Sequence, residues 1–460
     1  MAQCPFHPKP HKNKASLFTT FFLKRRSWLD GLFEKSYSMK MGRVKMPGLD
    51  LHVVNDPKEV RRIMVDEPRE FPKSELLHHL LEPLLGDSIF TTNDKVWEKQ
   101  SALLKPSFEM TRISKVFSLM SGATNDLIEH LDKNYKSGQI VEMDEQMTHV
   151  TADVIFRTIL SKELDRGQGT KVIKAFITYQ EETAQAAMRK MFCIPKWISY
   201  YMGEKKRIAA GEEIRDVLSK IIQPRYDAVQ NNTVGDEVDI LSTLLQVVDS
   251  DTNERFTFKE ILDQVAMLFL AGHETTASSL TWTFYLLSMF PEEQEKAYQE
   301  VLEVAKDEEF TIHHIRKMKH ISNIFKEALR LYPPVGFFAR ESRQETTMRG
   351  KDIKKGAGMV VAPWLIHRHK DFWEDPDGFN PSRHEDKSSI KKDTYFPFGM
   401  GERVCIGQGF AIQESMLIIS SILRNYKLEL EKDFVPDVVG RLTVRSANGM
   451  NIILTKREKQ

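Results

Sequence analysis

The longest uninterrupted pattern of apolar residues in the chain starts at Thr257 and ends before Pro291. Thr257 and Glu260 have the spacing of a capping box, in which each side chain bonds a backbone N–H of the first turn. No proline interrupts the pattern, and its centre, VAMLFLAG, is apolar on nearly all sides of a helix. We therefore predict a buried helix over 257–290, about 50 Å long. A membrane span is the alternative, but an adjacent histidine and glutamate at its centre argue against it.

Shorter patterns predict the other elements. Residues 41–55 alternate around Pro47-Gly48, which predicts a hairpin of two strands. The remaining predicted elements are a helix that starts at Asp56, a mostly helical stretch over 97–245 with breaks near Gly138, Gly167, Gly169 and Asn231, a helix over 314–332, and a helix over 407–425. Strand-like pieces lie between the last two helices and end the chain. The pattern predicts a mainly α fold with a minor β portion, in a single domain over 1–460.

Composition and charge exclude several classes of protein. The chain has 460 residues, of which 66 are basic and 65 acidic, and its net charge is +1. Nucleic acid is therefore not expected as a partner, because no basic excess is present to neutralise phosphates. The three cysteines, Cys4, Cys193 and Cys405, are too few and too scattered for a disulfide framework. A reducing compartment such as the cytoplasm is expected.

The start of the chain carries no secretory signal, because MAQCPFHPKPHKNK is polar and interrupted by proline. We expect residues 1–14 to be a mobile tail, and we assign no metal to Cys4, His7 and His11. The apolar run that follows is far shorter than the ~20 residues of a membrane span. Two interpretations stay open for residues 17–28, whose aromatic and basic residues suit peripheral contact with the inner membrane or a first helix packed on the body.

Cys405 lies in YFPFGMGERVCIGQGF, among four glycines and an arginine. No histidine is near it in sequence to activate it as a nucleophile, and it lacks a second ligand at the spacing of a zinc pair. Because glycine has no Cβ, this backbone permits tight turns and the close approach of a large flat ligand. We expect N–H groups of the following helix to favour the thiolate. A dinucleotide fingerprint is excluded because Val404 occupies its third glycine position.

The ten residues from Phe398 to Gly407, FGMGERVCIG, resemble the haem-binding loop of the cytochrome P450 family at every defining position. This family holds haem through a cysteine thiolate. The resemblance implies that Cys405 is the axial ligand of the haem iron and that Phe398 shields the sulfur. It also implies that Arg403 binds a haem propionate, because its fork of donors matches a carboxylate. The fold would be the family's triangular helical body, with the long central helix passing through the distal haem pocket.

A second motif contains Glu327 and Arg330, in FKEALRLYPP, which lie three residues apart on one helix face. Alone, this spacing indicates only an ordinary surface ion pair. Together with Arg383 in FNPSR, the two residues resemble the family's Glu-Arg-Arg lock. Such a buried network would fix the cysteine loop without taking part in the chemistry.

A third motif, AGHETT, occupies 271–276 at the centre of the long predicted helix. Gly272 costs ~1 kcal/mol relative to alanine in a helix interior, and an acid in an apolar stretch breaks a second local rule, which often marks a functional site. A threonine hydroxyl can also bond the carbonyl one turn back and loosen the helix. By resemblance, Ala271 and Gly272 border the oxygen-binding groove, Thr275 steadies dioxygen, and Glu274 joins the proton relay. A helix kink without chemistry is the alternative.

Two haem contacts are assigned by family position. Trp97 resembles the tryptophan near one haem propionate, and Arg340 aligns with an arginine that often meets the other. Many family members carry an arginine four residues after the tryptophan, where this chain has Ser101. Lys99 or another residue is expected to replace that contact.

The resemblance implies a haem-thiolate monooxygenase of a soluble, bacterial-like type. Such an enzyme inserts one atom of O2 into an apolar organic substrate, by hydroxylation or epoxidation, and reduces the other atom to water. Haem b would be held without a covalent bond, because no Cys-x-x-Cys-His is present, and His367 and His369 are given no ligand role. The chain has no flavin or iron–sulfur signature, so electrons from NAD(P)H would arrive through a ferredoxin or flavodoxin and its reductase. A monomer is expected.

Five lysines lie in segments expected near the cysteine side of the haem. Either they form a docking surface for an acidic redox carrier, or they are merely solvated. They are Lys95, Lys99, Lys105, Lys391 and Lys392.

Two other functions stay open. A peroxygenase driven by hydrogen peroxide needs no proton relay, so Glu274 and Thr275 argue against it. A haem protein that senses or carries a ligand is the second alternative. By family position the pocket is lined by largely apolar residues, which suit a fatty acid, terpenoid, steroid or xenobiotic. These residues are 74–90, 188–193, Phe269, Phe337, Phe338 and the segment near Ala447.

Overall fold

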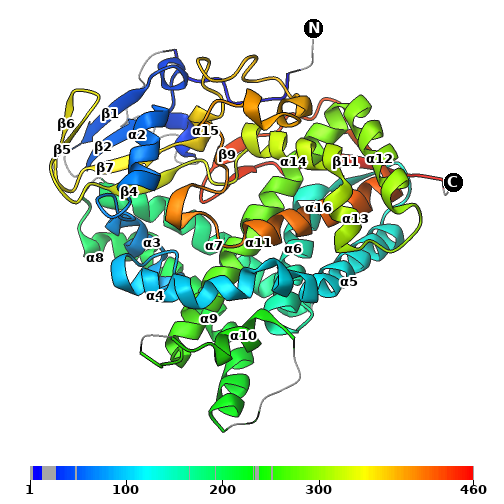
Figure 1. Ribbon diagram of the computed structural model, residues 1–460, viewed down its shortest axis with the longest axis horizontal. Coiled ribbons are helices and arrows are strands. Elements are labelled where there is room, and N and C mark those ends of the chain that lie inside the picture. Colours follow the sequence, from blue (N-terminus) through cyan, green and yellow to red (C-terminus); the bar gives the residue numbers. More distant parts are fainter. Residues whose placement is uncertain are drawn as a thin grey trace.

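Helices dominate the computed structural model of the chain, and the strands form a smaller portion toward one side (Figure 1). The structure describes residues 4–12, 27–46, 49–164, 166–191, 193–231, 233, 238–249 and 252–458. The outline tapers toward α9 and α10, so the body is roughly triangular (Figure 1). The prediction of a mainly α fold with a minor β portion is confirmed.

The α-helices of the described part of the chain follow in sequence order. They are α2 (Pro57–Arg61), α3 (Glu75–Leu85), α4 (Asp94–Leu104), α5 (Met110–Asn134), α6 (Met143–Leu160), α7 (Arg166–Met191), α8 (Lys196–Ser199), α9 (Lys205–Gln230), α10 (Ile240–Gln246), α11 (Phe258–Met289), α12 (Pro291–Ala305), α13 (Ile312–Lys317), α14 (Lys319–Leu331), α15 (Pro363–Ile366) and α16 (Gln408–Asn425). Short 3₁₀ and π turns lie between several of them.

The strands form small sheets. They are β1 (Met41–Met46), β2 (Leu49–Val54), β3 (Gln139–Glu142), β4 (Phe338–Glu341), β5 (Thr346–Met348), β6 (Lys351–Ile353), β7 (Gly358–Val361), β8 (Tyr426–Leu430), β9 (Val438–Gly440), β10 (Val444–Ser446) and β11 (Asn451–Lys456). The largest sheet has the order β1-β2-β7-β4, in which only the β2–β7 pair is parallel. The strands β3, β11 and β8 form a second sheet, and β9–β10 and β5–β6 are two-stranded.

Most predicted boundaries agree with the structure. The predicted hairpin is the antiparallel pair β1–β2, whose turn at Pro47-Gly48 lies outside the described residues. The capping box of α11 is present, with Thr257 and Glu260 bonding as expected. The predicted helix over 314–332 is two helices that meet at Met318. The break expected at Gly167 and Gly169 is wrong, because α7 runs through both positions.

Helix α11 runs through the centre of the molecule and packs against α6, α9, α14 and α16 (Figure 1). Among the residues that the structure describes, no helix is long and apolar enough to cross a membrane. Most residues of α11 are buried inside the protein, where this one helix contributes side chains to packing on several faces.

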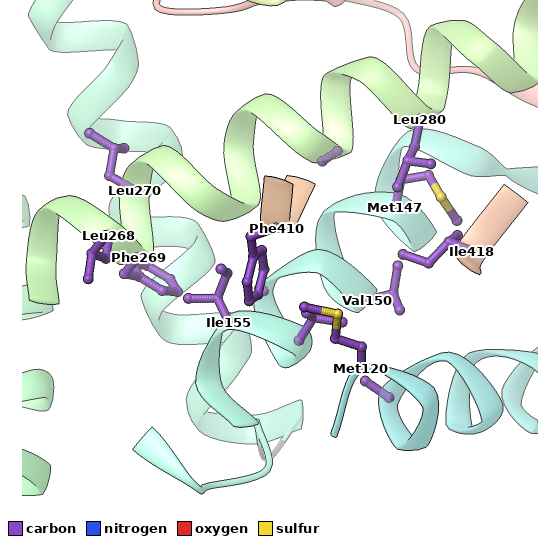
Figure 2. Packing of buried hydrophobic residues seen from close by; sticks show 14 of the residues in the cluster. Met120, Met147, Val150, Ile155, Leu268, Phe269, Leu270, Leu280, Phe410 and Ile418 are labelled. Atoms are coloured by element: carbon purple, nitrogen blue, oxygen red, sulfur yellow. The ribbon is translucent and has the colours of Figure 1, made fainter. Parts of the chain in front are cut away.

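The contact between α6 and α11 explains one glycine of the central motif. A Cβ on Gly272 would lie 2.4 Å from the Cδ1 atom of Ile155, so glycine lets α6 approach closely. Figure 2 shows Ile155 and Phe269 pointing toward one another at this contact, and Phe269 also meets the ring of Phe156 at 5.4 Å. Gly272 thus has a packing role, and α11 stays continuously helical there instead of loosening. Phe269 belongs to this contact, contrary to its expected place in the substrate pocket.

The expected mobile tail differs from the structure over residues 4–12, which lie against the body. The Phe6 N–H donates to the Tyr285 hydroxyl at 3.2 Å, and the Tyr332 hydroxyl donates to the Phe6 carbonyl. His7 lies 3.9 Å from the Asp377 carboxylate. Backbone groups satisfied by buried tyrosines are not free to fray, which explains the difference.

Only the end of the segment 17–28, proposed to contact a membrane, lies among the described residues. Trp28 packs edge-on against Phe337 at 5.3 Å and Trp364 at 6.2 Å. Its indole is part of the interior contact, so the membrane interpretation is wrong for this residue. Phe337, which was expected to line the pocket, takes part in the same aromatic contact.

We expect Gly272→Ala to reduce the free energy of unfolding by roughly 1–3 kcal/mol, because the new methyl group overlaps Ile155. Ile155→Val alone should cost about 1 kcal/mol. In the Ile155→Val background, Gly272→Ala should be neutral or stabilising, since alanine is the better helix former by about 1 kcal/mol. Denaturant unfolding of the four proteins tests this. An equal cost of Gly272→Ala in both backgrounds would contradict the packing explanation.

Candidate active site

A short turn holds Cys405 in front of α16. The Cys405 N–H donates to the Phe398 carbonyl at 2.9 Å. Gly401 has a φ of +71°, and a Cβ there would lie 2.3 Å from the carbonyl oxygen of Met64. Only glycine fits such a position. Helix α16 starts at Gln408, so the thiol lies just before a helix N-terminus, as the sequence predicts.

Cys405 as a whole residue is exposed, but its sulfur lies close enough to protein atoms to be partly desolvated. Burial raises the pKa of the thiol, and the Gly407 N–H acts in the opposite direction without cancelling that effect. The N–H at the helix start thus favours the thiolate, as expected, but desolvation opposes the charge more strongly. Coordination to a metal would deprotonate the thiol outright. A Cβ on Gly407 would meet no protein atom within 4 Å, so the loop is open on that side.

The central helix has one face that is not fully buried. From Ile261 to Leu287 every residue of α11 is buried except Ala271, Gly272 and Thr275, which are partly exposed. A helical period puts positions 271 and 275 on one face. An accessible strip in the middle of a buried helix indicates space beside it within the fold. These are three of the four residues that the sequence assigns to the oxygen-binding groove.

The fourth residue, Glu274, points to a different neighbour. Its carboxylate accepts hydrogen bonds from Arg445 at 2.7 and 3.0 Å and from the Thr443 hydroxyl at 2.5 Å. Burial alone would raise the pKa of Glu274, but Arg445 and then Thr443 hold it down at about 2. Arg445 also donates to Asp144 at 2.7 Å, which is partly exposed. The Thr275 hydroxyl donates to the Ala271 carbonyl at 2.7 Å, the back-bond that the motif predicts.

A second carboxyl, near the turn of α11 that contains Thr275 and Thr276, was missed by the sequence analysis. Glu414 of α16 is buried, and this burial raises its pKa well above the usual range, with the Thr276 hydroxyl acting in the opposite direction. Burial thus favours the neutral form of Glu414, whereas Arg445 favours the ionised form of Glu274. Its position in CIGQGFAIQE, nine residues after Cys405, carries no signal of its own in a single sequence.

Three cations cluster beside the cysteine loop. Lys73, Arg340 and Arg403 are nearly buried, and burial together with their mutual repulsion lowers the pKa of Arg340 to about 9 and that of Lys73 well below its usual value. Within the described part of the chain, neither Lys73 nor Arg340 forms an ion pair; Arg403 has only Glu402, at 3.9 Å. Buried like charges are costly without a counter-charge, so this cluster suits an anionic group.

Trp97 lies between two of these cations. Its ring is 5.7 Å from Lys73 Nζ and 5.5 Å from the guanidinium of Arg403. Trp97, Arg340 and Arg403 are thus in the cluster, as the family positions imply. Lys99 is not the replacement for the missing arginine at Ser101, because it faces Glu254 at 3.5 Å. Lys73, which the sequence analysis missed, supplies the additional cation. Its only signal in the sequence is its position between Phe71 and the apolar residues that follow.

The Glu-Arg-Arg residues meet in a buried network under the loop. Glu327 and Arg330 form two hydrogen bonds of 2.8 and 2.9 Å, and Arg383 lies 3.3 Å from the same carboxylate. His384 at 3.0 Å, which the sequence analysis missed, and the Asn380 N–H at 3.1 Å complete the shell of Glu327. Burial raises the pKa of Glu327, but the charge of Arg330 and the bond from His384 outweigh it and leave the pKa at about 2.

The network reaches the cysteine loop through backbone atoms. Arg330 donates to the carbonyls of His367, Pro376 and Gly378 at 2.6 to 2.9 Å. His367 in turn accepts the Phe396 N–H at 3.0 Å, two residues before the turn that holds the thiol. The described residues contain no group of three or more His, Cys, Asp or Glu side chains that could hold a metal ion. The Nε2 atom of His367 is occupied by its bond with the Phe396 N–H. Its role in the structure is to connect the lock to the loop.

Comparison with known proteins decides the family. The family model described as Cytochrome P450 matches residues 11–450. The chain belongs to the cytochrome P450 family. This cytochrome P450 is similar to cytokinin hydroxylase of Arabidopsis thaliana, at 30% identity over 80% of this chain and 72% of the relative. It is similar to 11-oxo-beta-amyrin 30-oxidase of Medicago truncatula, at 28% identity over 88% of this chain and 78% of the relative. Its fold matches the cytochrome P450DA heme domain, with a TM-score of 0.83, 23% identity and coverage of 99% of both chains.

The enzyme is accordingly a haem-thiolate monooxygenase that uses haem iron and O2, a redox partner and a hydrophobic substrate. The site residues of this cytochrome P450 fit the cofactor. The exposed thiol of Cys405 would take the iron, and the Lys73–Arg340–Arg403 cluster lacks the anionic charge that two propionates would bring. The names of these relatives, an oxidase and a hydroxylase, favour neither a haem sensor nor a peroxide-driven enzyme.

We expect Glu327→Gln to reduce the free energy of unfolding at neutral pH by about 3 kcal/mol, because Arg330 would stay buried without its counter-charge. The pKa of Glu327 is depressed in the fold, so its contribution is present above the unfolded pKa of about 4.3 and is lost as pH falls toward about 2. The stability difference between the two proteins should shrink over that window in denaturant titrations.

Asp216→Asn is the matched control, because its exposed pair with Lys220 should be worth less than about 0.5 kcal/mol. A Glu327→Gln effect as small as the control, or one that does not depend on pH, would contradict the account of the lock.

Proposed function

We propose that this enzyme hydroxylates or epoxidises an apolar organic molecule, with haem b held non-covalently between the Cys405 loop and the accessible face of α11. The observation that carries the proposal is the partial exposure of Ala271, Gly272 and Thr275 within an otherwise buried helix. Bound haem supplies the activation of O2, and electron donation from a thiolate ligand favours O–O cleavage.

Cys405 is the proposed axial ligand of the iron. Phe398, whose carbonyl accepts the Cys405 N–H, shields the sulfur from water, and Gly407 leaves the face of the loop open. Arg403, Arg340 and Trp97 hold the propionates, with Lys73 as a further donor. Guanidinium groups suit this task because two N–H groups match one carboxylate. The lock of Glu327, Arg330 and Arg383 fixes the loop and does not touch the substrate.

Thr275 and Glu274 are the proposed groups that handle protons. The Thr275 hydroxyl is on the accessible face and donates its hydrogen to the Ala271 carbonyl, so its lone pairs can accept a hydrogen bond from a proton donor on that face. Glu274 is ionised and paired with Arg445, so it serves as a relay only when that pair opens. Arg445 and Asp144 then connect Glu274 with the surface. Glu414, whose pKa is raised by burial, is a second carboxyl close to the same turn of α11.

The substrate is proposed to be apolar, because the family acts on hydrophobic substrates. The relatives are named for oxidation of 11-oxo-beta-amyrin and hydroxylation of cytokinin. A terpenoid or another lipid-like compound therefore suits this chain. The match over residues 11–450 supports a single domain, and we propose a monomer in the cytoplasm that can contact a membrane surface.

Electrons are proposed to come from NAD(P)H through a ferredoxin or flavodoxin. Lys95, Lys105, Lys391 and Lys392 are exposed, and an acidic carrier would be attracted to them. Lys99 is less suited, because Glu254 lies beside it.

We expect Thr275→Ala to leave substrate binding intact but to uncouple the reaction, so that oxygen is consumed and released mainly as hydrogen peroxide. The physical reason is the loss of the hydroxyl oxygen that accepts a hydrogen bond, and so positions a proton donor, on the accessible face. Thr283→Ala is the matched control, because its hydroxyl makes the same back-bond, at 2.7 Å to Ser279, in a fully buried part of the helix. Product and peroxide per O2 consumed are the measurements. Unchanged coupling would refute the role of Thr275, and absence of oxygen consumption in the wild type would favour a sensor.

We expect the double variant Lys391→Glu and Lys392→Glu to slow reduction of the haem by an acidic carrier several-fold, with the largest effect at low salt. Substrate affinity, read from the haem spectrum, should not change. The matched control is the pair Lys354→Glu and Lys355→Glu, two exposed neighbours at the turn between β6 and β7. Equal rates for all three proteins in stopped-flow reduction would remove this docking surface from the account.

A further inference from the structure

Two buried polar atoms beside the N-terminal part of α11 have no hydrogen-bond partner within the described part of the chain. They are Nε2 of Gln264, on α11, and the hydroxyl oxygen of Ser88, in the loop between α3 and α4. The Ile89 N–H donates to Oε1 of Gln264 at 3.0 Å, and Ser88 precedes Ile89 in the chain. The two unpartnered atoms therefore belong to groups on either side of one bond. Buried polar atoms are nearly always paired in folded proteins, so two of them together require an explanation.

The loop that carries Ser88 is held in place by other bonds. Asp263, the residue before Gln264, accepts the Asp87 N–H at 3.1 Å. Gln100 of α4 donates to the Asp87 carbonyl at 2.6 Å. Gly86 has a φ of +51°, and a Cβ there would collide with the Asp263 carboxylate, so glycine lets the loop approach α11. The backbone on both sides of Ser88 is thus fixed on α11 and α4.

The bond from Ile89 also fixes the orientation of the Gln264 amide. A backbone N–H can donate to the amide oxygen but not to the amide nitrogen, so Oε1 faces the loop. The Nε2 group is therefore presented as a donor, and its two N–H groups have no acceptor among the described residues. Such a preorganised donor costs a ligand little to engage, because the side chain is already held in one orientation.

Gln264 lies on the same face of α11 as the accessible residues of the proposed site. Positions 264, 268, 271 and 275 follow the helical period, and Ala271 and Thr275 are partly exposed. Ala271 follows seven residues after Gln264, which is about 10 Å along the helix axis. Leu268 lies between them. This face of α11 therefore combines hydrocarbon with a polar pair, Gln264 and Ser88, at the end away from Thr275.

We propose that Gln264 and Ser88 bind a hydroxyl group of the substrate, so that the substrate class is an elongated apolar alcohol. The inference deepens the proposed function and rests on it. A hydroxyl satisfies both atoms, because its oxygen accepts from Nε2 of Gln264 while its hydrogen donates to the Ser88 oxygen. The hydroxyl would lie about 10 Å from the carbon that is oxidised beside Ala271 and Thr275.

The charges around the polar pair favour a neutral group over an ionised one. Asp263 binds Arg215 at 2.6 Å, and Lys259 lies between Asp263 at 3.0 Å and Asp87 at 3.2 Å. Both cations are thus engaged by carboxylates, and a substrate carboxylate would lie near two groups of its own charge. A substrate ammonium would meet the donor of Gln264 and has no lone pair to accept from it.

The test compares matched probes on the haem-loaded full chain. Each primary alkanol from octanol to tetradecanol is paired with the terminal fluoroalkane of the same length, which has nearly the same shape but cannot donate. Calorimetry gives the two dissociation constants, and a shift of the Soret band shows that the probe lies beside the haem. We expect the best alkanol to bind more tightly than its fluoroalkane partner, because only the alkanol satisfies both buried atoms.

Variants of the polar pair separate its hydrogen bonds from the shape of the loop. Gln264→Leu should reduce the preference for alkanol over fluoroalkane roughly tenfold, because the donor is lost. Ser88→Ala should reduce it roughly threefold to tenfold, and it leaves the bond between Gln264 and Ile89 in place. Gln100→Leu is the matched control, because it removes two buried bonds of the same loop, to the Asp87 carbonyl and the Thr92 hydroxyl, but neither partner of the substrate. Its preference should equal that of the wild type.

Three results would overturn the inference. Equal binding of alkanol and fluoroalkane beside the haem would show that a fixed water, and not a substrate hydroxyl, pairs with the two atoms, and the proposed function would be unaffected. A preference that falls as far in Gln100→Leu as in Gln264→Leu would assign it to the position of the loop. Failure of every probe to bind would count against the apolar substrate of the proposed function as well.

Discussion

The proposed site depends on one constraint, which is that the loop that carries Cys405 is held in a fixed position. The turn that carries Cys405 is short and contains residues that tolerate no Cβ, so it cannot hold its own shape by side-chain packing. Its position comes from α14, where the Glu327–Arg330 pair fixes the carbonyls of a distant loop and His367 passes that constraint to Phe396. The buried ion pair is expensive on its own, and its use is geometric precision at the loop.

The electrostatics of the site follow from what the cofactor brings. A thiol with a raised pKa and three buried cations without sufficient counter-charge would each destabilise a protein that lacked haem. In the proposed site Cys405 would bind the iron as the thiolate, and Lys73, Arg340 and Arg403 would be neutralised by the propionates. The burial of these groups, which is unfavourable without haem, would therefore favour the binding of haem. The carboxyls beside the α11 motif differ in the same way, because Arg445 lowers the pKa of Glu274 whereas burial raises the pKa of Glu414.

Sequence reasoning found what local patterns encode and missed what only tertiary proximity creates. The capping box at Thr257, the hairpin β1–β2 and the thiol loop are short-range signals, and all of them are present. Lys73, His384 and Arg445 come from distant segments, so no spacing rule could assign them to their partners. Gly272 was interpreted as a mark of a functional site, and the structure shows in addition that its absent Cβ admits Ile155 of another helix. Residues 4–12 looked like a tail because proline and charge dominate them, yet two buried tyrosines bind their backbone.

The central claim is that the Cys405 sulfur is the ligand of haem iron, and carbon monoxide tests it most directly. The purified holoprotein is reduced, exposed to carbon monoxide and compared with Cys405→His. The account predicts the strongly red-shifted Soret absorption that a trans thiolate produces for the wild type, and the ordinary band of an imidazole-ligated haem for the variant. A wild type that lacks the red shift, or a variant that retains it, would contradict the account.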